Sequence, residues 1–393
     1  MQQLNKIDKT TVYIESSALL NTRLSGIGHL TLSMVKGLRD SKEFNSKYKL
    51  KLIVPVNKVH FIPHWNIDDI EIKKIFLPAR VWNVIPKFKF LPPINFFIGK
   101  GIYIFPNFRA WPLYNSGSIT YIHDISFLLY PEFTEAKNLK MLKHNIDRWI
   151  KQSSIIITDS NASNDEIKEQ FNQYEDKIKT IYCGVDNQLF SPPKSSKVKN
   201  ILKRYNITKS YIMFLSNLEP RKNIERLLTS IQNLPLSYKD QYEIVLIGGM
   251  SWNDALIRDK INQLVSEGWG VVQPSSYVPD EDIPALLTAA SVLVHPAIHE
   301  GFGIPPIEAM SCETPVIVSD IKVLREICGK AAVYVDPYDI KDISTKIEQV
   351  LGDKKLQKEL VTLGKKNAMN FTWEKSTTSL IKELNVLSNR GTE

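Results

Sequence analysis

The sequence predicts an α/β protein built from two Rossmann-like domains that face each other across a cleft. A chain of 393 residues is longer than one core usually supports, because single domains seldom grow beyond about 250 to 300 residues. In both halves, apolar runs of strand length alternate with amphipathic stretches of helix length. That alternation is typical of repeated β-α units around a parallel sheet.

The first half contains six apolar runs of strand length. They are Val12–Ile14, Leu50–Val54, Ile102–Phe105, Ile119–Ile122, Ile155–Thr158 and Ile178–Tyr182. Helices are expected where apolar residues recur at helical spacing, at Gly28–Arg39, Ala136–Gln152 and Asn161–Phe171. The order of these elements predicts one parallel sheet with helices packed on it.

A segment rich in Pro, Ser and Lys, FSPPKSSKVK at 190–199, lies at the middle of the chain and has no periodicity. We therefore expect a first domain at 1–190, a linker at 191–199 and a second domain at 200–371. Strands of the second domain are predicted at Tyr211–Leu215, Glu243–Ile247, Gly270–Val272, Val292–His295, Pro315–Val318 and Val333–Val335. Amphipathic helices should fill Asp339–Asn389, and the helix at 372–393 is expected to return to the first domain.

Composition is that of a soluble globular protein, with 43% apolar and 23% charged residues. No apolar stretch is long enough to span a bilayer, and the start MQQLNKIDKT lacks the apolar core of a signal peptide. We therefore expect a cytoplasmic protein. The three cysteines are too few and too widely spaced for a disulfide framework or a metal cluster, and are read as buried free thiols.

Positive charge is concentrated in the first half of the chain. Residues 1–200 carry 28 Lys and Arg against 18 Asp and Glu, whereas 201–393 carry 22 against 24. No acidic residue lies between Glu71 and Asp124, and basic and aromatic residues alternate through 73–109. Such a surface suits the anionic headgroups of a membrane at the inner face of the cell. It would equally suit nucleic acid, and the aromatic residues could instead belong to the core.

In open α/β sheets, ligands bind at the carboxyl ends of the strands, which directs attention to three loops of the second domain. The loop after 211–215 contains Ser216, Arg221 and Lys222, and the two cations could neutralise a diphosphate. The loop after 243–247 is Gly248-Gly249. The loop after 292–295 leads through Glu300-Gly301-Phe302-Gly303-Ile304-Pro305-Pro306 to a helix start at Ile307–Met310. Glycines and a helix start favour phosphate, and flanking carboxylates can accept hydrogen bonds from sugar hydroxyls.

The run Tyr277-Val278-Pro279-Asp280, followed by EGFGIPPIEAM at 300–310, resembles the donor-site signature of the retaining family 4 glycosyltransferases of GT-B fold. The subgroup it most resembles includes bacterial mannosyltransferases of O-antigen and capsule assembly. The resemblance covers nearly the whole chain, is strongest in 211–335 and is weakest in 40–110.

The resemblance implies a role for each matching residue. Glu300 would contact hydroxyls of the transferred sugar and Glu308 the ribose. Lys222 would bind the diphosphate, with Arg221 in place of a family arginine whose usual position is occupied by Ser216-Asn217. Backbone N–H groups of Gly301, Phe302, Gly303 and Ile304 would face sugar and phosphate, and Tyr277 and Val278 the nucleobase. His295 and His299 are interpreted as a packed strand residue and a surface loop residue.

In the first domain, Ser25-Gly26-Ile27-Gly28-His29 forms a glycine loop before a helix, and His123-Asp124 follows a strand. By themselves, the glycines fit a plain tight turn and the pair fits a buried structural interaction. The resemblance implies that Gly26 and Gly28 lie against the donor phosphates and that His123 faces the donor sugar.

The resemblance therefore implies a retaining hexosyltransferase that moves a sugar, mannose from GDP-mannose by preference, to a glycan or lipid-linked acceptor. It implies no obligatory metal ion, and no Asp-x-Asp motif is present. A UDP-, dTDP- or ADP-sugar donor remains open, as does a sugar-nucleotide epimerase or phosphorylase. A nucleic-acid-binding protein is the alternative of a different class, but no helix-turn-helix, zinc or RNA-binding signature supports it.

Overall fold

The computed structural model describes residues 9–76, 92–249, 255–275 and 277–390. The chain divides into two compact units. Unit 1 comprises Met1–Leu128, Ala136–Cys183 and Trp373–Glu393, and unit 2 comprises Leu129–Glu135 and Gly184–Thr372. The chain thus passes from unit 1 to unit 2 after residue 183, before the linker predicted at 191–199, and the last residues of that linker open helix α8 (Ser195–Arg204).

Unit 1 contains a sheet of seven strands, all parallel, in the order β3-β2-β1-β4-β5-β6-β7. Their bounds are β1 Thr10–Glu15, β2 Tyr48–Pro55, β3 Glu71–Ile75, β4 Ile102–Phe105, β5 Ser118–Tyr121, β6 Ile155–Thr158 and β7 Ile178–Thr180. The six predicted strands are all present. The sequence EIKKI of β3 was missed because it is half-exposed and contains no apolar run.

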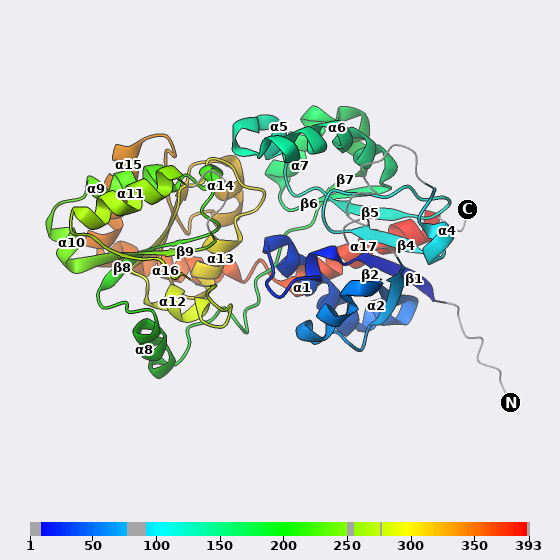
Figure 1. Ribbon diagram of the computed structural model, residues 1–393, viewed down its shortest axis with the longest axis horizontal. Helices are drawn as coiled ribbons and strands as arrows, with labels where there is room; N and C mark the ends of the chain where they lie inside the picture. The colour runs from blue at the N-terminus through cyan, green and yellow to red at the C-terminus, as the bar shows by residue number, and fades with distance from the viewer. Residues whose placement is uncertain (1–8, 77–91, 250–254, 276, 391–393) are drawn as a thin grey trace. The chain divides into compact units, whose positions relative to one another are not determined.

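Helices cover both faces of the unit 1 sheet (Figure 1). The helices of this unit are α1 Gly26–Asp40, α2 Lys42–Lys47, α4 Asn95–Ile98, α5 Ser126–Leu129, α6 Ala136–Gln152, α7 Asn161–Gln170 and α17 Trp373–Arg390. On one face, Trp149 and Ile150 of α6 and Ile167 of α7 pack with Tyr103 and Phe105 of β4. Helices α1 and α17 pack against each other, and α17 also reaches β4.

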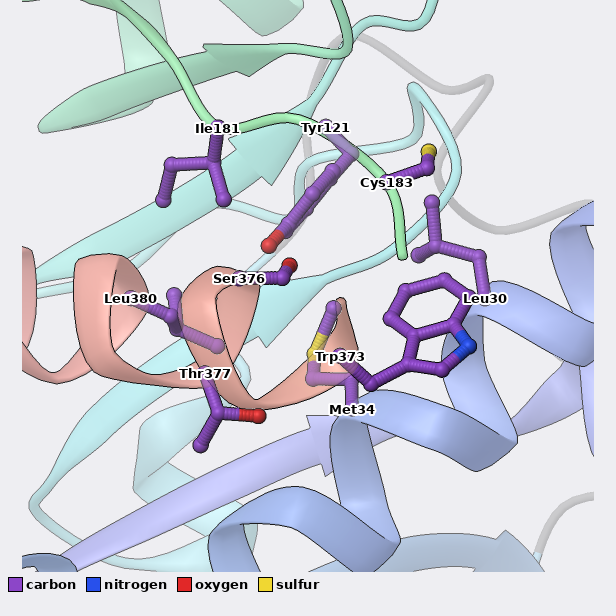
Figure 2. A pocket seen from close by; sticks show the side chains of 9 residues that line it. All are labelled: Leu30, Met34, Tyr121, Ile181, Cys183, Trp373, Ser376, Thr377 and Leu380. Carbon is purple, nitrogen blue, oxygen red and sulfur yellow. The ribbon is translucent and has the colours of Figure 1, made fainter. Parts of the chain in front are cut away.

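The last helix, α17, completes the core of unit 1. Its residues Leu380, Ile381 and Leu384 are at most 2% exposed, and Tyr48 of β2 donates a hydrogen bond to Asn385 Oδ1 at 2.9 Å. Figure 2 shows the junction, where side chains of α17 and α1, together with Tyr121, Ile181 and Cys183, enclose a gap of only about 10 Å³. A gap of that size holds at most one water molecule, so the helix is closely packed against the rest of the unit.

Unit 2 contains six parallel strands in the order β10-β9-β8-β11-β12-β13. The strands are β8 Ser210–Leu215, β9 Tyr242–Ile247, β10 Gly270–Val272, β11 Val292–His295, β12 Val316–Ser319 and β13 Val333–Val335. The helices are α8 Ser195–Arg204, α9 Ile224–Gln232, α10 Ser237–Gln241, α11 Ala255–Ser266, α12 Ile283–Ala289, α13 Ile304–Ser311, α14 Lys322–Cys328, α15 Ile340–Gly352 and α16 Lys354–Ala368. The predicted α/β class is confirmed in both units.

In unit 2, helices α9, α11 and α15 lie on one face of the sheet, and α12 and α13 on the other, while α16 contacts both α13 and α15 (Figure 1). The order β9-β8-β11 places the first strand of the unit between two later ones. The carboxyl ends of β8 and β11 are therefore neighbours, and the loops that follow them lie side by side at one edge of the sheet.

Candidate functional site

The loops after β8 and β11 are tied together at the carboxyl edge of the unit 2 sheet. The backbone N–H of Ile298 donates to the carbonyl oxygen of Arg221 at 2.9 Å. Arg221 Nη1 donates to the carbonyl oxygen of His299 at 2.6 Å. Asn223, at a positive φ of 62°, donates from its side chain to the carbonyl oxygen of Pro296 at 2.9 Å. These bonds hold the two loops in a fixed register.

The two loops bring four of the polar side chains into one buried cluster around Glu300. Its Oε1 accepts hydrogen bonds from Lys222 Nζ at 2.6 Å and from His295 Nε2 at 2.7 Å. Its Oε2 has a longer contact of 3.4 Å with Arg221 Nη1. Glu300 is 6% exposed and Lys222 is 9% exposed. The ion pair is therefore shielded from water, which makes each partner depend on the other.

Glu300 is a carboxylate and His295 is neutral. Burial alone would raise the pKa of Glu300, but the charges of Lys222 and Arg221 and the bond from His295 outweigh it and hold that pKa well below its usual value. Burial lowers the pKa of His295 despite the bond to Glu300. In the described part of the chain, His295 Nδ1 has no hydrogen-bond partner. The imidazole thus carries its proton on Nε2 and donates it to Glu300.

Of the two histidines near this loop, only His299 differs from its sequence interpretation. His295 is packed at the end of β11 as expected, but its bond to Glu300 was missed. The available signal was a polar residue ending the apolar run VLVH, five residues before Glu300. His299, interpreted as a surface residue, is only 5% exposed, and its ring centroid lies 5.5 Å from that of Tyr130. The hydrogen bond that the His299 carbonyl oxygen accepts from Arg221 keeps this part of the loop close to the protein interior.

Helix α13 begins at Ile304, three residues earlier than predicted, and takes both prolines into its first turn. Gly303 caps it at φ 95° and ψ 56°, where a side chain would be strained, and a Cβ at this position would lie 2.7 Å from Leu324 Cδ2. Because Pro305 and Pro306 carry no N–H, the donors at this helix start are concentrated at Gly303 and Ile304. Such a start attracts anions.

Glu308 lies one turn farther along α13 and has a different electrostatic environment. The side chain is half-buried, and burial together with the nearby charge of Asp280 raises the pKa of its carboxyl to about 8. Asp280 also accepts a hydrogen bond from the Tyr277 hydroxyl at 2.6 Å. The residues that the resemblance assigns to ribose and nucleobase are therefore linked through Asp280. Val278, the second nucleobase candidate, is buried.

Tyr277 also borders an open groove of about 670 Å³, which it lines together with Tyr205 and Gln273. That volume lies within the range of about 300 to 1,000 Å³ found for small-molecule sites. The tyrosine itself is 39% exposed. Its ring is thus accessible to a planar ligand.

Two other predicted ligand-contact residues of unit 2, Ser216 and Phe302, are fixed by backbone bonding and by packing. The N–H of Ser216 donates to the carbonyl oxygen of Ile247 at 3.0 Å, and a Cβ on Gly248, whose φ is 149°, would overlap the carbonyl oxygen of Ser216. Phe302 is 4% exposed, with its ring 5.5 Å from that of Phe371. The Phe302 side chain thus belongs to the core, so Phe302 can meet a ligand only through its backbone.

Gly26, Gly28 and His123 belong to unit 1, whereas the other predicted site residues belong to unit 2. The helix was predicted to begin at Gly28, at the end of a glycine loop, but α1 begins at Gly26 and both glycines lie in its first turn. The Ser25 side chain caps this turn by accepting from the Gly28 N–H at 3.3 Å. A Cβ on Gly28 would lie 3.0 Å from the Leu24 side chain, so this glycine allows a close approach between the turn and the preceding chain.

His123 follows β5 and is bound by Asp159, which follows the neighbouring strand β6. The Nδ1 atom of His123 lies 2.7 Å from Asp159 Oδ2, and its Nε2 atom lies 2.9 Å from the carbonyl oxygen of Pro106. The buried histidine–aspartate pair is therefore real, but its acid is Asp159 and not the adjacent Asp124. Asp124 instead accepts from the Ser126 N–H at 2.8 Å. The sequence signal for Asp159 was its place directly after the apolar strand IIIT.

The described residues contain neither a metal-binding cluster nor a membrane-spanning helix. Within 9–76, 92–249, 255–275 and 277–390, no group of three or more His, Cys, Asp or Glu side chains is arranged to hold a metal ion. None of the helices in these ranges is both long and apolar enough to cross a membrane.

Comparison with known proteins gives a consistent result. The model of the family "Glycosyl transferases group 1" matches residues 197–367. O-antigen chain mannosyltransferase B of Escherichia coli is 30% identical over 93% of this chain and 97% of its own length. O-antigen chain mannosyltransferase RfbU of Salmonella typhimurium is 30% identical over 61% of this chain and 62% of its own. The crystal structure of Anabaena HepE with UDP and glucose aligns with a TM-score of 0.70 over 96% of this chain and 99% of its own, at 16% identity.

Proposed function

The chain belongs to the glycosyl transferases of group 1, and on this premise we propose that it is a retaining mannosyltransferase. The donor would be a nucleotide diphosphate sugar, GDP-mannose in the first instance, and the acceptor a glycan or lipid-linked glycan of a cell-surface polysaccharide. The O-antigen mannosyltransferases to which the chain is similar support the sugar and the acceptor class. The single observation that carries the reaction is the buried Glu300 carboxylate at the carboxyl edge of the unit 2 sheet.

Glu300 is suited to hold the transferred sugar. Its Oε1 already accepts two short hydrogen bonds, whereas Oε2 has only the 3.4 Å contact with Arg221. The Oε2 atom therefore retains acceptor capacity for sugar hydroxyls, which are hydrogen-bond donors. The low pKa of Glu300 keeps it ionised at neutral pH, so it accepts these bonds as a charged group.

The leaving diphosphate needs positive charge and N–H donors as the glycosidic bond to phosphate breaks. Lys222 and Arg221 supply the charge, and the backbone at Gly303 and Ile304 supplies the donors. Lys222 is bound to Glu300 in this structure, so the donor phosphate would share or take over one of its three N–H bonds. In this proposal the acceptor attacks from the face of the departing phosphate, a phosphate oxygen takes up its proton, and no metal ion is required.

The nucleoside would lie along α13 and the segment that precedes α12. Glu308, with a pKa of about 8, is largely protonated at neutral pH and can both donate to and accept from ribose hydroxyls. Tyr277 and Val278 border the nucleobase, with the exposed ring of Tyr277 available for stacking.

A panel of donors tests this proposal. A ligand that binds only the native state stabilises it by about 2.7 kcal/mol at one hundred times its Kd. We expect GDP and GDP-mannose to raise the melting temperature more than the UDP, dTDP and ADP compounds at equal concentration. A larger rise with UDP-glucose would contradict the choice of donor. Conversion of the nucleotide sugar into another nucleotide sugar without any acceptor would instead identify an epimerase.

A second part of the proposal concerns the basic and aromatic segment 73–109 of unit 1. Residues 77–91, which include Trp82, Phe88 and Phe90, lie outside the described residues. Among the described aromatic residues of this segment, Tyr103 and Phe105 are buried, whereas Phe76, Phe96 and Phe97 are 85%, 62% and 71% exposed, and Trp111 just beyond the segment is buried as well. Exposed rings beside cations favour contact with an anionic membrane over a purely structural role. Such contact would hold the enzyme at the inner face of a membrane, beside a lipid-linked acceptor.

Vesicle binding tests this contact. The double variant Phe96→Ser/Phe97→Ser should sediment less with phosphatidylserine vesicles than the wild type does, because two exposed rings no longer enter the interface. The control is Leu236→Ser in unit 2, where a side chain that is 75% exposed is removed elsewhere. Equal sedimentation of all three proteins, or equal binding to uncharged phosphatidylcholine vesicles, would contradict the membrane role.

A further inference from the structure

His123 lies where three neighbouring parallel strands of unit 1 end. In the pairing of β5 with β6, Tyr121 lies opposite Ile157, and the Ile122 N–H donates to the carbonyl oxygen of Ile157. Continued by two residues, the same register sets His123 opposite Asp159. Strand β4 on the other side ends one residue before Pro106. The sheet itself, and not a flexible loop, therefore fixes the distances between these groups.

Both ring nitrogens of His123 face acceptors. Pro106 offers a carbonyl oxygen at 2.9 Å, which can only accept, so Nε2 must carry a proton. Asp159 Oδ2 lies 2.7 Å from Nδ1, the separation of a charge-assisted hydrogen bond. A neutral imidazole has only one N–H. Two donated bonds therefore require the imidazolium form, and the negative charge that balances it resides on Asp159.

We propose that Asp159 is a positioning residue that, with the Pro106 carbonyl, keeps His123 doubly protonated, so that unit 1 presents a cation at the carboxyl edge of its sheet. This inference rests on the proposed function for its role in transfer, since a fixed cation stabilises negative charge that develops on a leaving group. His123 is partly open to solvent, with 12% of its side chain exposed, whereas the Asp159 side chain is 8% exposed. The cation is therefore accessible to a ligand, whereas the Asp159 carboxylate that balances its charge is more deeply buried.

The surroundings of His123 agree with this assignment. Burial lowers the pKa of the imidazole, but the charge and hydrogen bond of Asp159, the Pro106 bond and the more distant charge of Asp124 outweigh it and leave the pKa raised. The other titratable groups nearby are Tyr121 and Cys183, whose own pKa values burial and Asp159 hold well above their usual values. Both are therefore neutral at physiological pH and do not compete for the proton.

His295 differs from His123 in its hydrogen-bond partners and in its charge. His295 has one acceptor, Glu300, and no partner at its second nitrogen among the described residues, and burial keeps it neutral. Two histidines at the carboxyl ends of strands thus differ in charge. His123 faces two acceptors and is a cation, whereas His295 faces one acceptor and is kept neutral mainly by burial.

Asp159→Asn tests the proposal, with Asp124→Asn as the matched control. Nitrogen-detected NMR of the histidine rings, with His123 assigned by the loss of its signals in His123→Gln, reports the charge directly. In the wild type, His123 should show two protonated nitrogens at pH 7. Asp159→Asn should lower its titration midpoint by about one to three pH units, the usual effect of removing an opposite charge at contact distance, and Asp124→Asn by less.

The same variants are then assayed for transfer. The limb on which kcat/KM falls with rising pH should move to lower pH in Asp159→Asn and stay nearly in place in Asp124→Asn. A His123 ring with one protonated nitrogen at pH 7, or an unchanged midpoint in Asp159→Asn, would overturn the proposal. If the NMR result holds but no nucleotide sugar is used at any pH, the proposed function fails and the charge assignment stands.

Discussion

At the scale of single residues, Glu300 and Lys222 are mutually dependent because both are buried and their charged atoms lie 2.6 Å apart. Glu300→Gln should lower kcat/KM at least about a hundredfold and lower the free energy of unfolding by roughly 3 kcal/mol, because Lys222 then lacks a buried counter-charge. The double variant Glu300→Gln/Lys222→Met should regain most of the stability but no activity. Activity assays and thermal unfolding measure the two effects.

The control for this pair is Glu313→Gln, which removes an exposed carboxylate that pairs with Lys365. Exposed pairs contribute at most about 1 kcal/mol, so this variant should keep both stability and activity. Glu300→Gln with wild-type turnover, or a double variant that is less stable than the single one, would show that the buried pair does not have the role assigned to it.

The raised pKa of Glu308 predicts that the free energy of unfolding depends on pH. Its pKa is about 8 in the folded protein against an ordinary value of 4.5. Between these values the folded protein keeps a proton that the unfolded chain has lost, so Glu308 makes the free energy of unfolding fall as pH rises. Glu308→Gln removes this dependence. The stability of the variant relative to the wild type should therefore increase from pH 5 to pH 8, by up to about 1.4 kcal/mol per unit.

Denaturant unfolding at several pH values measures this difference, and parallel curves for the two proteins would contradict it.

Some of the contacts between these residues could be predicted from the sequence, and others could not. Glu300, Lys222 and Arg221 could be predicted as neighbours because each follows a strand of one sheet. The bond from His295 to Glu300 could not, because it depends on how the loop after β11 folds back on its own strand. The bond between His123 and Asp159 could not either, because it depends on strand order and register, which a single sequence does not specify.

At the scale of elements, α17 is far from unit 1 in sequence yet contributes buried residues to it. Leu384, in the middle of the helix, is fully buried, whereas Val386 is 41% exposed. Leu384→Ala should lower the stability of unit 1 by about 2 to 5 kcal/mol, and Val386→Ala should change it by less than about 0.5 kcal/mol. Hydrogen exchange should show faster exchange in α1 and α17 but not in α9. Equal loss of protection in both units would contradict the assignment of this helix.

Most elements could be predicted because the sheets are buried on both faces and their strands read as continuous apolar runs. Strand β3, EIKKI, escaped because it lies at the edge of its sheet and is half-exposed. Helix boundaries were less certain where special residues begin a helix. Two glycines enter the first turn of α1 and two prolines the first turn of α13, although each pair also fits a loop.

At the scale of the whole molecule, the proposed donor-binding groups and His123 lie in different units. Unit 2 contains the buried carboxylate, the two cations and the helix start, and unit 1 contains His123 and the exposed aromatic surface. The long motif at 300–310 could be interpreted from sequence because its residues are contiguous. The contribution of unit 1 is dispersed over several strand ends and was therefore much less visible.

The central claim is retention in the transfer of mannose from a nucleotide sugar. Its most direct test is the anomeric configuration of the product formed from GDP-α-mannose and a synthetic lipid-linked mannoside, determined by the one-bond C1–H1 coupling in NMR. The account predicts an α-linked mannose in the wild-type reaction and no product with Glu300→Gln. A β-linked product would contradict it.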